Sequence, residues 1–133
     1  HPIDRMPELL GVQVSFVRQL SEAGVIDLRK SPAGRDLVDG HDFPLIRVCD
    51  ELRHFGIGPK NLRQYVIAAN RESAMFEQAL MVFATKGGVA READDETRHQ
   101  FDQAFQRILA LTDSVRDELV SRRVRESFKD LQG

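Results

Sequence analysis

The stretch GVQVSFVRQLSEAGVI, residues 11–26, decides the expected fold at the start of the chain. Its apolar residues recur at the three-residue spacing of one helix face: Val14, Val17 and Leu20. Gly11 and Gly24 border this run, and glycine commonly stands at helix ends. Residues 3–10 repeat the helical period, with Asp4 as the expected N-cap. The sequence therefore predicts two short helices joined by a turn.

The helical period is interrupted after this pair and then returns. Residues 27–42, DLRKSPAGRDLVDGHD, hold proline and glycine between short apolar runs, a pattern typical of a small hairpin or wing. Residues 43–55 are again helical in period. After a glycine and proline corner, a further helix is expected from Pro59 to Phe83.

The last part of the chain predicts one long amphipathic helix over residues 97–133, capped by Asp95 or Thr97. Its stripe follows heptad spacing: Phe101, Phe105, Ile108, Thr112, Val115 and Leu119. Beyond Leu119 the apolar positions move to another face: Val120, Val124, Phe128 and Leu131. The heptad stripe is either a core face of the same chain or a seam between subunits. We favour the seam, as a two-fold antiparallel helix pair, because a long helix packed only on its own small domain would leave its far end unsupported.

These elements predict a mainly helical, all-α fold with three parts. Residues 1–85 form a winged-helix unit with its following helix, residues 86–96 form a polar linker, and residues 97–133 form the long helix. The linker is expected because KGG and READDE lie between two apolar periodic segments.

Composition excludes several classes of protein. Hydrophobic residues make up 41% of the 133 residues and charged residues 30%, which is ordinary for a soluble globular chain. The single Cys49 has no disulfide partner, and its apolar surroundings indicate a buried small residue. No apolar run is long enough to cross a membrane, and no signal peptide precedes the domain, so we expect a cytoplasmic protein.

Catalytic patterns are missing from the sequence. The histidines are scattered, no serine or cysteine has a histidine at a meaningful spacing, and no phosphate-binding glycine loop is present. We therefore expect no enzyme, no metal site and no cofactor. The net charge of −2 argues against a domain held to nucleic acid by its field alone, although residues 29–63 are mildly basic.

The order of elements, together with residues 11–66, resembles the MerR family of bacterial transcription regulators. The family's Gly-Val, Leu-Arg and Glu-x-x-Gly-Leu elements correspond to Gly11-Val12, to Val17-Arg18 and, out of step by one residue, to Glu22-Ala23-Gly24-Val25. A later signature is matched by Phe55, Gly56, Ile57, Leu62 and Arg63. The resemblance implies a winged helix-turn-helix, a helix pair and a long dimerisation helix.

The chain departs from the MerR pattern where that family contacts DNA. The tyrosine pair after the reader's arginine is replaced by Gln19 and Leu20, and Asp36 stands where the wing usually has an arginine. The segment HFGIGPKNLRQYVIAANRESAMFEQAL resembles the C-terminal half of FtsR-type actinobacterial cell-division regulators. That resemblance implies a dimer that binds DNA through a different part of the whole protein.

Two hypotheses for function follow. In the first, the chain is the C-terminal dimerisation and effector half of a MerR-type regulator, and this fragment binds DNA weakly or not at all. In the second, it is a stand-alone winged-helix domain whose DNA contacts come from α-helical and wing residues: Ser15, Arg18, Arg29, Lys30 and Arg35. Arg18 could instead pair with Glu22 one turn away. Lys60, Arg63 and Arg71 are candidates for contact with a partner or with the missing DNA-binding half. A small-molecule effector is a third possibility, which no residue identifies.

Overall fold

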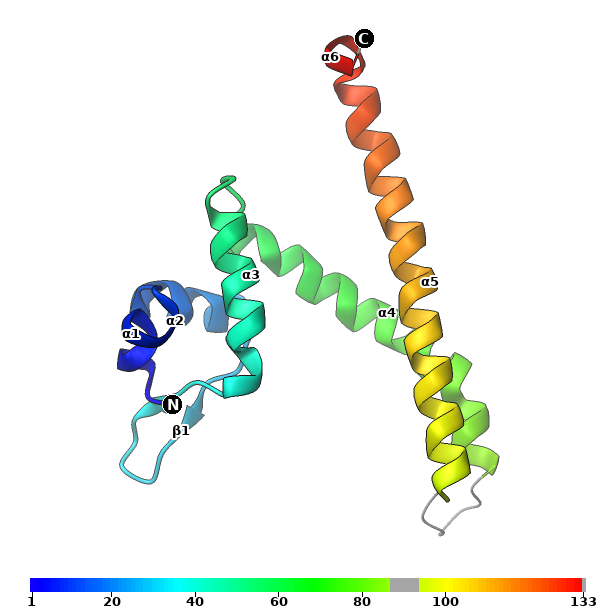
Figure 1. Ribbon diagram of the computed structural model, residues 1–133, viewed down its shortest axis with the longest axis horizontal. Coiled ribbons are helices and arrows are strands. Elements are labelled where there is room, and N and C mark those ends of the chain that lie inside the picture. The colour runs from blue at the N-terminus through cyan, green and yellow to red at the C-terminus, as the bar shows by residue number, and fades with distance from the viewer. Residues whose placement is uncertain (87–93, 133) are drawn as a thin grey trace. The chain divides into compact units, whose positions relative to one another are not determined.

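The computed structural model describes residues 1–86 and 94–132. It divides the chain into two compact units, His1–Arg71 and Glu72–Gly133. Helix α4, Pro59–Lys86, contributes its first part to the first unit and its last part to the second. Most of the predicted linker at 86–96 falls outside the described residues. The mainly helical fold predicted from the sequence is confirmed (Figure 1).

The first unit opens with the helical pair expected from residues 3–26. It consists of a 3₁₀ turn at Ile3–Arg5, α1 at Met6–Leu10 and α2 at Val14–Glu22. The predicted N-cap at Asp4 is wrong, because Asp4 lies inside the 3₁₀ turn and α1 begins after it, with a proline in its first turn. Gly11 ends α1 in the left-handed conformation, at a φ of 69°.

The wing is present as a short antiparallel hairpin. Strands β1, Arg29–Lys30, and β2, Asp36–Leu37, pair with Arg29 opposite Leu37. Pro2 adds an isolated bridge to Leu37, so the chain start also contacts the wing. A 3₁₀ turn at Gly40–Asp42 leads into α3, Phe43–Arg53. The predicted hairpin and the helix that follows it are confirmed.

One apolar core holds α1, α2, the wing and α3 together. Its most deeply buried side chains come from each of these elements: Met6, Val17, Leu20, Val38 and Ile46. Val17 and Leu20 are fully buried, as their spacing in the sequence predicted. Leu62 of α4 completes the core and fixes the start of that helix on the first unit.

Gly24 ends α2 at a φ of 85°, and a Cβ there would lie 2.8 Å from Arg63 Nη1 and 3.3 Å from Val66 Cγ1. We expect Gly24→Ala to lower the free energy of unfolding by about 2 kcal/mol, because it adds backbone strain and a close contact. Gly34→Ala is the matched control, since Gly34 has a φ of 83° but no atom within 4 Å of such a Cβ. Urea unfolding followed by circular dichroism measures both variants. Equal losses would show that the contact with α4 is immaterial.

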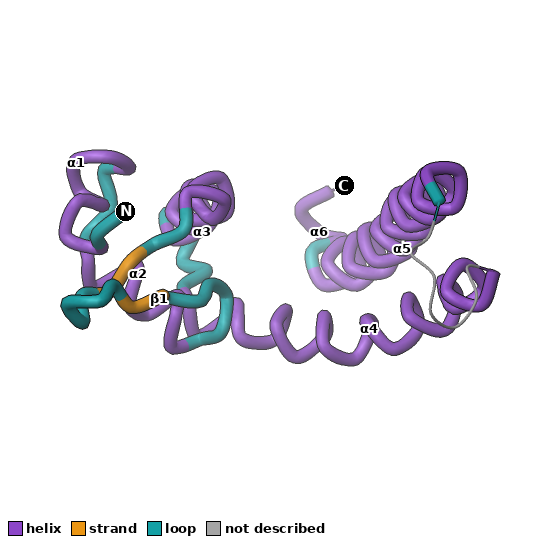
Figure 2. Tube along the Cα trace, turned by 90° about the horizontal axis from the view of Figure 1, so that it is seen from below, coloured by secondary structure: helices purple, strands orange, loops and turns teal. Residues whose placement is uncertain are grey.

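The second unit is a helical hairpin. The C-terminal part of α4 lies beside α5, Asp95–Ser127, and a short α6, Lys129–Gln132, follows (Figures 1 and 2). The predicted cap of the long helix was misplaced by one residue or more: Asp94 is the N-cap, and its Oδ1 accepts a hydrogen bond from Thr97 N at 2.7 Å. Hydrogen bonds from Thr97 hold the pKa of Asp94 below its usual value.

Candidate functional site

The residues predicted to contact DNA lie on α2 and the wing, and Asp36 connects two of them. Its Oδ2 accepts a hydrogen bond from Arg18 Nη1 at 2.5 Å, and its Oδ1 lies 2.6 Å from Lys30 Nζ. The Asp36 side chain is only 15% exposed, whereas those of Arg18 and Lys30 are 49% and 68% exposed. The carboxylate therefore lies between the two cations, and Arg18 pairs with the wing instead of with Glu22.

The same contacts keep Asp36 ionised. Hydrogen bonds from Lys30 and then Arg18 hold the pKa of this carboxyl below its ordinary value, because both stabilise the charged form. The negative charge persists at neutral pH and is lost only in acid below that ordinary value. Asp36 thus offsets part of the positive field that Arg18 and Lys30 would present to a phosphate backbone.

The other three residues predicted to contact DNA have longer or fewer side-chain contacts. Arg29 Nη2 lies 3.7 Å from an oxygen of Asp39, whose pKa is lowered chiefly by a hydrogen bond from the backbone of His41. Ser15 Oγ lies 3.5 Å from Gln13 Oε1. The Arg35 backbone N–H donates to Ser31 Oγ, and within the described residues its guanidinium forms no ion pair. The structure therefore brings Arg18 and Lys30 together but leaves the remaining candidates apart.

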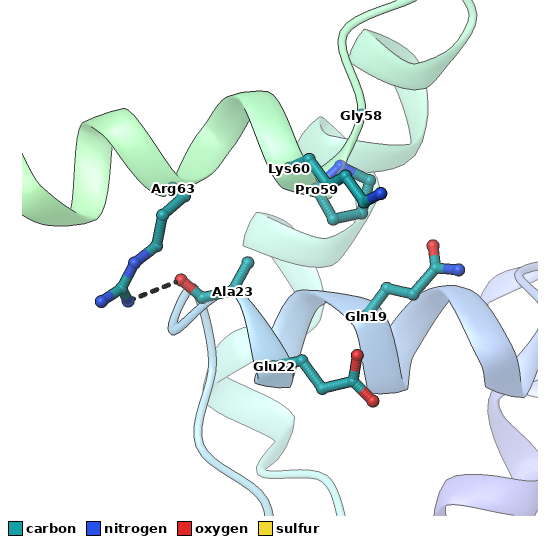
Figure 3. A pocket seen from close by; sticks show the side chains of 7 residues that line it. All are labelled: Gln19, Glu22, Ala23, Gly58, Pro59, Lys60 and Arg63. Carbon is teal, nitrogen blue, oxygen red and sulfur yellow. Dashed lines mark hydrogen bonds between the residues drawn. The ribbon is translucent and has the colours of Figure 1, made fainter.

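Of the predicted partner-contact residues, Arg63 has a role inside the first unit. Its Nη1 donates to the Ala23 carbonyl oxygen at 3.0 Å, one of the acceptors left over at the end of α2 (Figure 3). Figure 3 also shows Lys60 at the start of α4, opposite Gln19 and Glu22 of α2. These residues line an open depression of about 590 Å³. Arg71 is exposed farther along α4.

A second depression of the first unit is mainly apolar and lies between α3 and α4. Its lining includes Leu45, Val48 and Cys49 of α3 and Tyr65 of α4. Cys49 is 3% exposed, which confirms the predicted buried small residue, and burial raises the pKa of its thiol. The thiol therefore stays protonated at neutral pH.

The helical hairpin of the second unit is closed by an aromatic row and an ion pair. The rings of Phe76 and Phe105 are 6.0 Å apart between centroids, and those of Phe83 and Phe101 are 6.1 Å apart. Arg116 Nη2 donates to Glu72 Oε1 at 2.6 Å, and this bond raises the pKa of Arg116. Phe101 and Phe105 therefore pack against α4 of the same chain.

The heptad stripe predicted on α5 is thus divided by the structure. Its first part, with Ile108 and Thr112 half-buried after the two phenylalanines, continues the face that packs on α4. Its last part is more exposed, since Val115 is 60% and Leu119 is 47% exposed. Sequence spacing identified the stripe correctly but could not separate its intramolecular part from its exposed part.

Among residues 1–86 and 94–132, no three histidine, cysteine or acidic side chains are grouped to hold a metal ion. In the same residues, none of the helices combines the length and the apolar character that a bilayer crossing requires.

Residues 4–128 match the family described as Rv1828-like, C-terminal domain. No curated protein matches the sequence. Because the family match covers nearly the whole length, the chain belongs to the Rv1828-like C-terminal domain family.

Proposed function

We propose that this chain is the dimerisation and effector domain of a MerR-type transcription regulator, and that the sequence-specific DNA reader is another part of the protein. The proposal rests on the exposed apolar end of the α5 stripe, at Val115 and Leu119. This end follows the part of the stripe whose phenylalanines pack on α4. The family name, which describes a C-terminal domain, supports it. We propose no catalytic role, and the FtsR-type resemblance supports cell division as the regulated process.

Further exposed apolar residues extend the proposed dimer face. Met75 directly precedes Phe76 on α4, and Leu111 and Val115 directly precede Thr112 and Arg116 on α5. In an antiparallel helix pair, the residues that directly precede the mutually packed residues on each helix all point to one side of the pair. Met75, Leu111 and Val115 are 57%, 48% and 60% exposed. Two hairpins that meet on this side would form a four-helix contact with an apolar centre.

The dimer is tested first with the unmodified chain. Size-exclusion chromatography with light scattering should give twice the mass of the chain at tens of micromolar. A strict monomer at those concentrations would contradict the proposal, because the exposed apolar face would then not join two subunits.

In this proposal the winged-helix unit presents too little positive charge to hold DNA, and it provides a scaffold or a protein-contact surface. The ion pairs of Asp36 support this view, since this wing carboxylate pairs with both Arg18 of α2 and Lys30 of β1. The rival is a stand-alone DNA-binding domain, for which the well-formed wing and the exposed Arg35 are the favourable observations.

Asp36→Asn distinguishes these views. We expect the unmodified chain to bind a random DNA duplex more weakly than about 10 µM at low salt, and Asp36→Asn to bind several-fold more tightly, because Arg18 and Lys30 lose their shared carboxylate. Fluorescence anisotropy at two salt concentrations measures this. Glu51→Gln on α3 removes the same charge from an exposed position and is the matched control. Tight, steeply salt-dependent binding by the unmodified chain, weakened by Arg18→Ala, would favour the rival.

A further inference from the structure

The end of α5 and the residues after it carry a second set of exposed apolar side chains, here called the distal face. They are Val120 and Val124 of α5, Phe128 at its C-cap and Leu131 of α6, which are 56%, 50%, 53% and 82% exposed. Val124 follows Val115 by nine residues, which is about two and a half turns of helix at ~3.6 residues per turn. The distal face therefore lies on the side of α5 opposite Val115, and a dimer formed on the Val115 side leaves it uncovered.

The four basic residues between positions 122 and 129 differ in whether a carboxylate pairs with them. Arg122 Nε pairs with Glu118 Oε1 at 2.9 Å, and Lys129 Nζ pairs with Glu126 Oε1 at 3.3 Å. Arg123 and Arg125 form no ion pair with any residue that the structure describes. They stand directly before and after Val124, so their side chains leave the helix about 100° to either side of it, within reach of a partner seated on Val124. The cations without a carboxylate are thus the two that flank the apolar residues.

A second copy of this chain is a poor partner for the distal face. When two copies pair through it, the flanking arginines of both copies come to the edges of one seam, where like charges repel. Upstream, the same face is interrupted by Asp113 and Asp117, so the apolar overlap of two copies is limited to the last turns of the helix. A partner with carboxylates beside its own apolar stripe matches both the shape and the charge of this surface.

We propose that the distal face of α5 is the docking site for an acidic amphipathic helix of another protein. The apolar stripe of that helix lies against Val124 and Phe128, and its flanking carboxylates pair with Arg123 and Arg125. Apolar contact supplies most of the affinity in this mode of helix recognition, and the charges select the partner and fix its position. The inference goes beyond the proposed dimer, because it uses the other side of α5.

The test uses the whole chain and two labelled synthetic helical peptides with the same leucine stripe, one flanked by glutamates and one by lysines. Fluorescence anisotropy should show tighter binding of the glutamate peptide. The double variant Arg123→Glu, Arg125→Glu should bind it about tenfold more weakly and should bind the lysine peptide more tightly. Val124→Asp should weaken the binding of both peptides, because it places a charge within the stripe.

The matched control is the double variant Arg122→Glu, Lys129→Glu, which makes the same charge change at the two cations that already have carboxylate partners. It should keep the preference for the glutamate peptide, and circular dichroism checks that each variant remains helical. Equal affinity for the two peptides, or an equal loss in the control, overturns the proposal. Binding of phosphatidylserine vesicles or random duplex DNA in preference to the peptide, removed by the Arg123 and Arg125 changes, overturns it in favour of a lipid or nucleic-acid surface.

Light scattering separates this inference from the proposed function. The Val124→Asp variant should remain a dimer, because Val124 lies on the side of α5 opposite Val115. Conversion of this variant to a monomer would show that the distal face belongs to the dimer and would overturn the docking proposal while leaving dimerisation intact.

Discussion

The double variant Val115→Glu, Leu119→Glu is expected to be monomeric at tens of micromolar in light scattering. Both residues are exposed in the single chain, so the substitutions should leave the folded monomer intact. In the proposed dimer they would bury carboxylates in an apolar contact, which costs several kcal/mol and raises the dissociation constant more than about 100-fold.

The matched control for this experiment is Val120→Glu, Val124→Glu on the opposite side of α5, where the two valines are 56% and 50% exposed. This control has the same number of new charges on the same helix and should stay dimeric. A dimer that survives the Val115 and Leu119 changes but dissociates in the control would place the subunit contact on the distal face instead.

Phe105→Ala is expected to lower the free energy of unfolding of the second unit by about 3 kcal/mol. Phe105 contacts both Phe76 of α4 and Phe101 of α5, with ring centroids 6.0 and 6.1 Å away, so its loss opens a cavity in the aromatic row. Urea unfolding monitored by circular dichroism measures the effect as a lower midpoint of the helical transition that belongs to the hairpin.

Phe55→Ala makes the same chemical change at a side chain that is 79% exposed and should alter stability by less than about 0.5 kcal/mol. An equally small effect of Phe105→Ala would mean that the aromatic row does not hold the hairpin. In a dimer, the stability of the hairpin also depends on protein concentration, so both variants are compared at one concentration.

Local sequence signals located nearly every element of the first unit. Val17 and Leu20 recur at helical spacing and are fully buried, and the stretch with Pro32 and Gly34 between β1 and β2 forms the predicted turn. These signals succeed because spacing and backbone preference act within a few residues. They failed at caps, where Asp94 and not Asp95 or Thr97 accepts the first hydrogen bond, since neighbouring acids offer equivalent local choices.

The candidate site was less predictable than the fold. The sequence marked Arg18, Lys30 and Asp36 as relevant, but it gave no indication that one carboxylate would accept from both cations. It also named Arg63 as a partner-contact residue, whereas Arg63 donates to the Ala23 carbonyl. These three contacts join residues 6, 18 and 40 positions apart, and such pairings depend on how the elements pack together.

The sequence by itself determined that this protein is mainly helical, that a small wing follows two short helices, and that the last helix carries a long apolar stripe. Only the tertiary structure decided which part of that stripe is already used, because Phe101 and Phe105 meet Phe83 and Phe76 across the hairpin, while Val115 and Leu119 remain 60% and 47% exposed. The physical reason is that periodicity along a helix shows which side is apolar, whereas burial depends on which other element reaches that side.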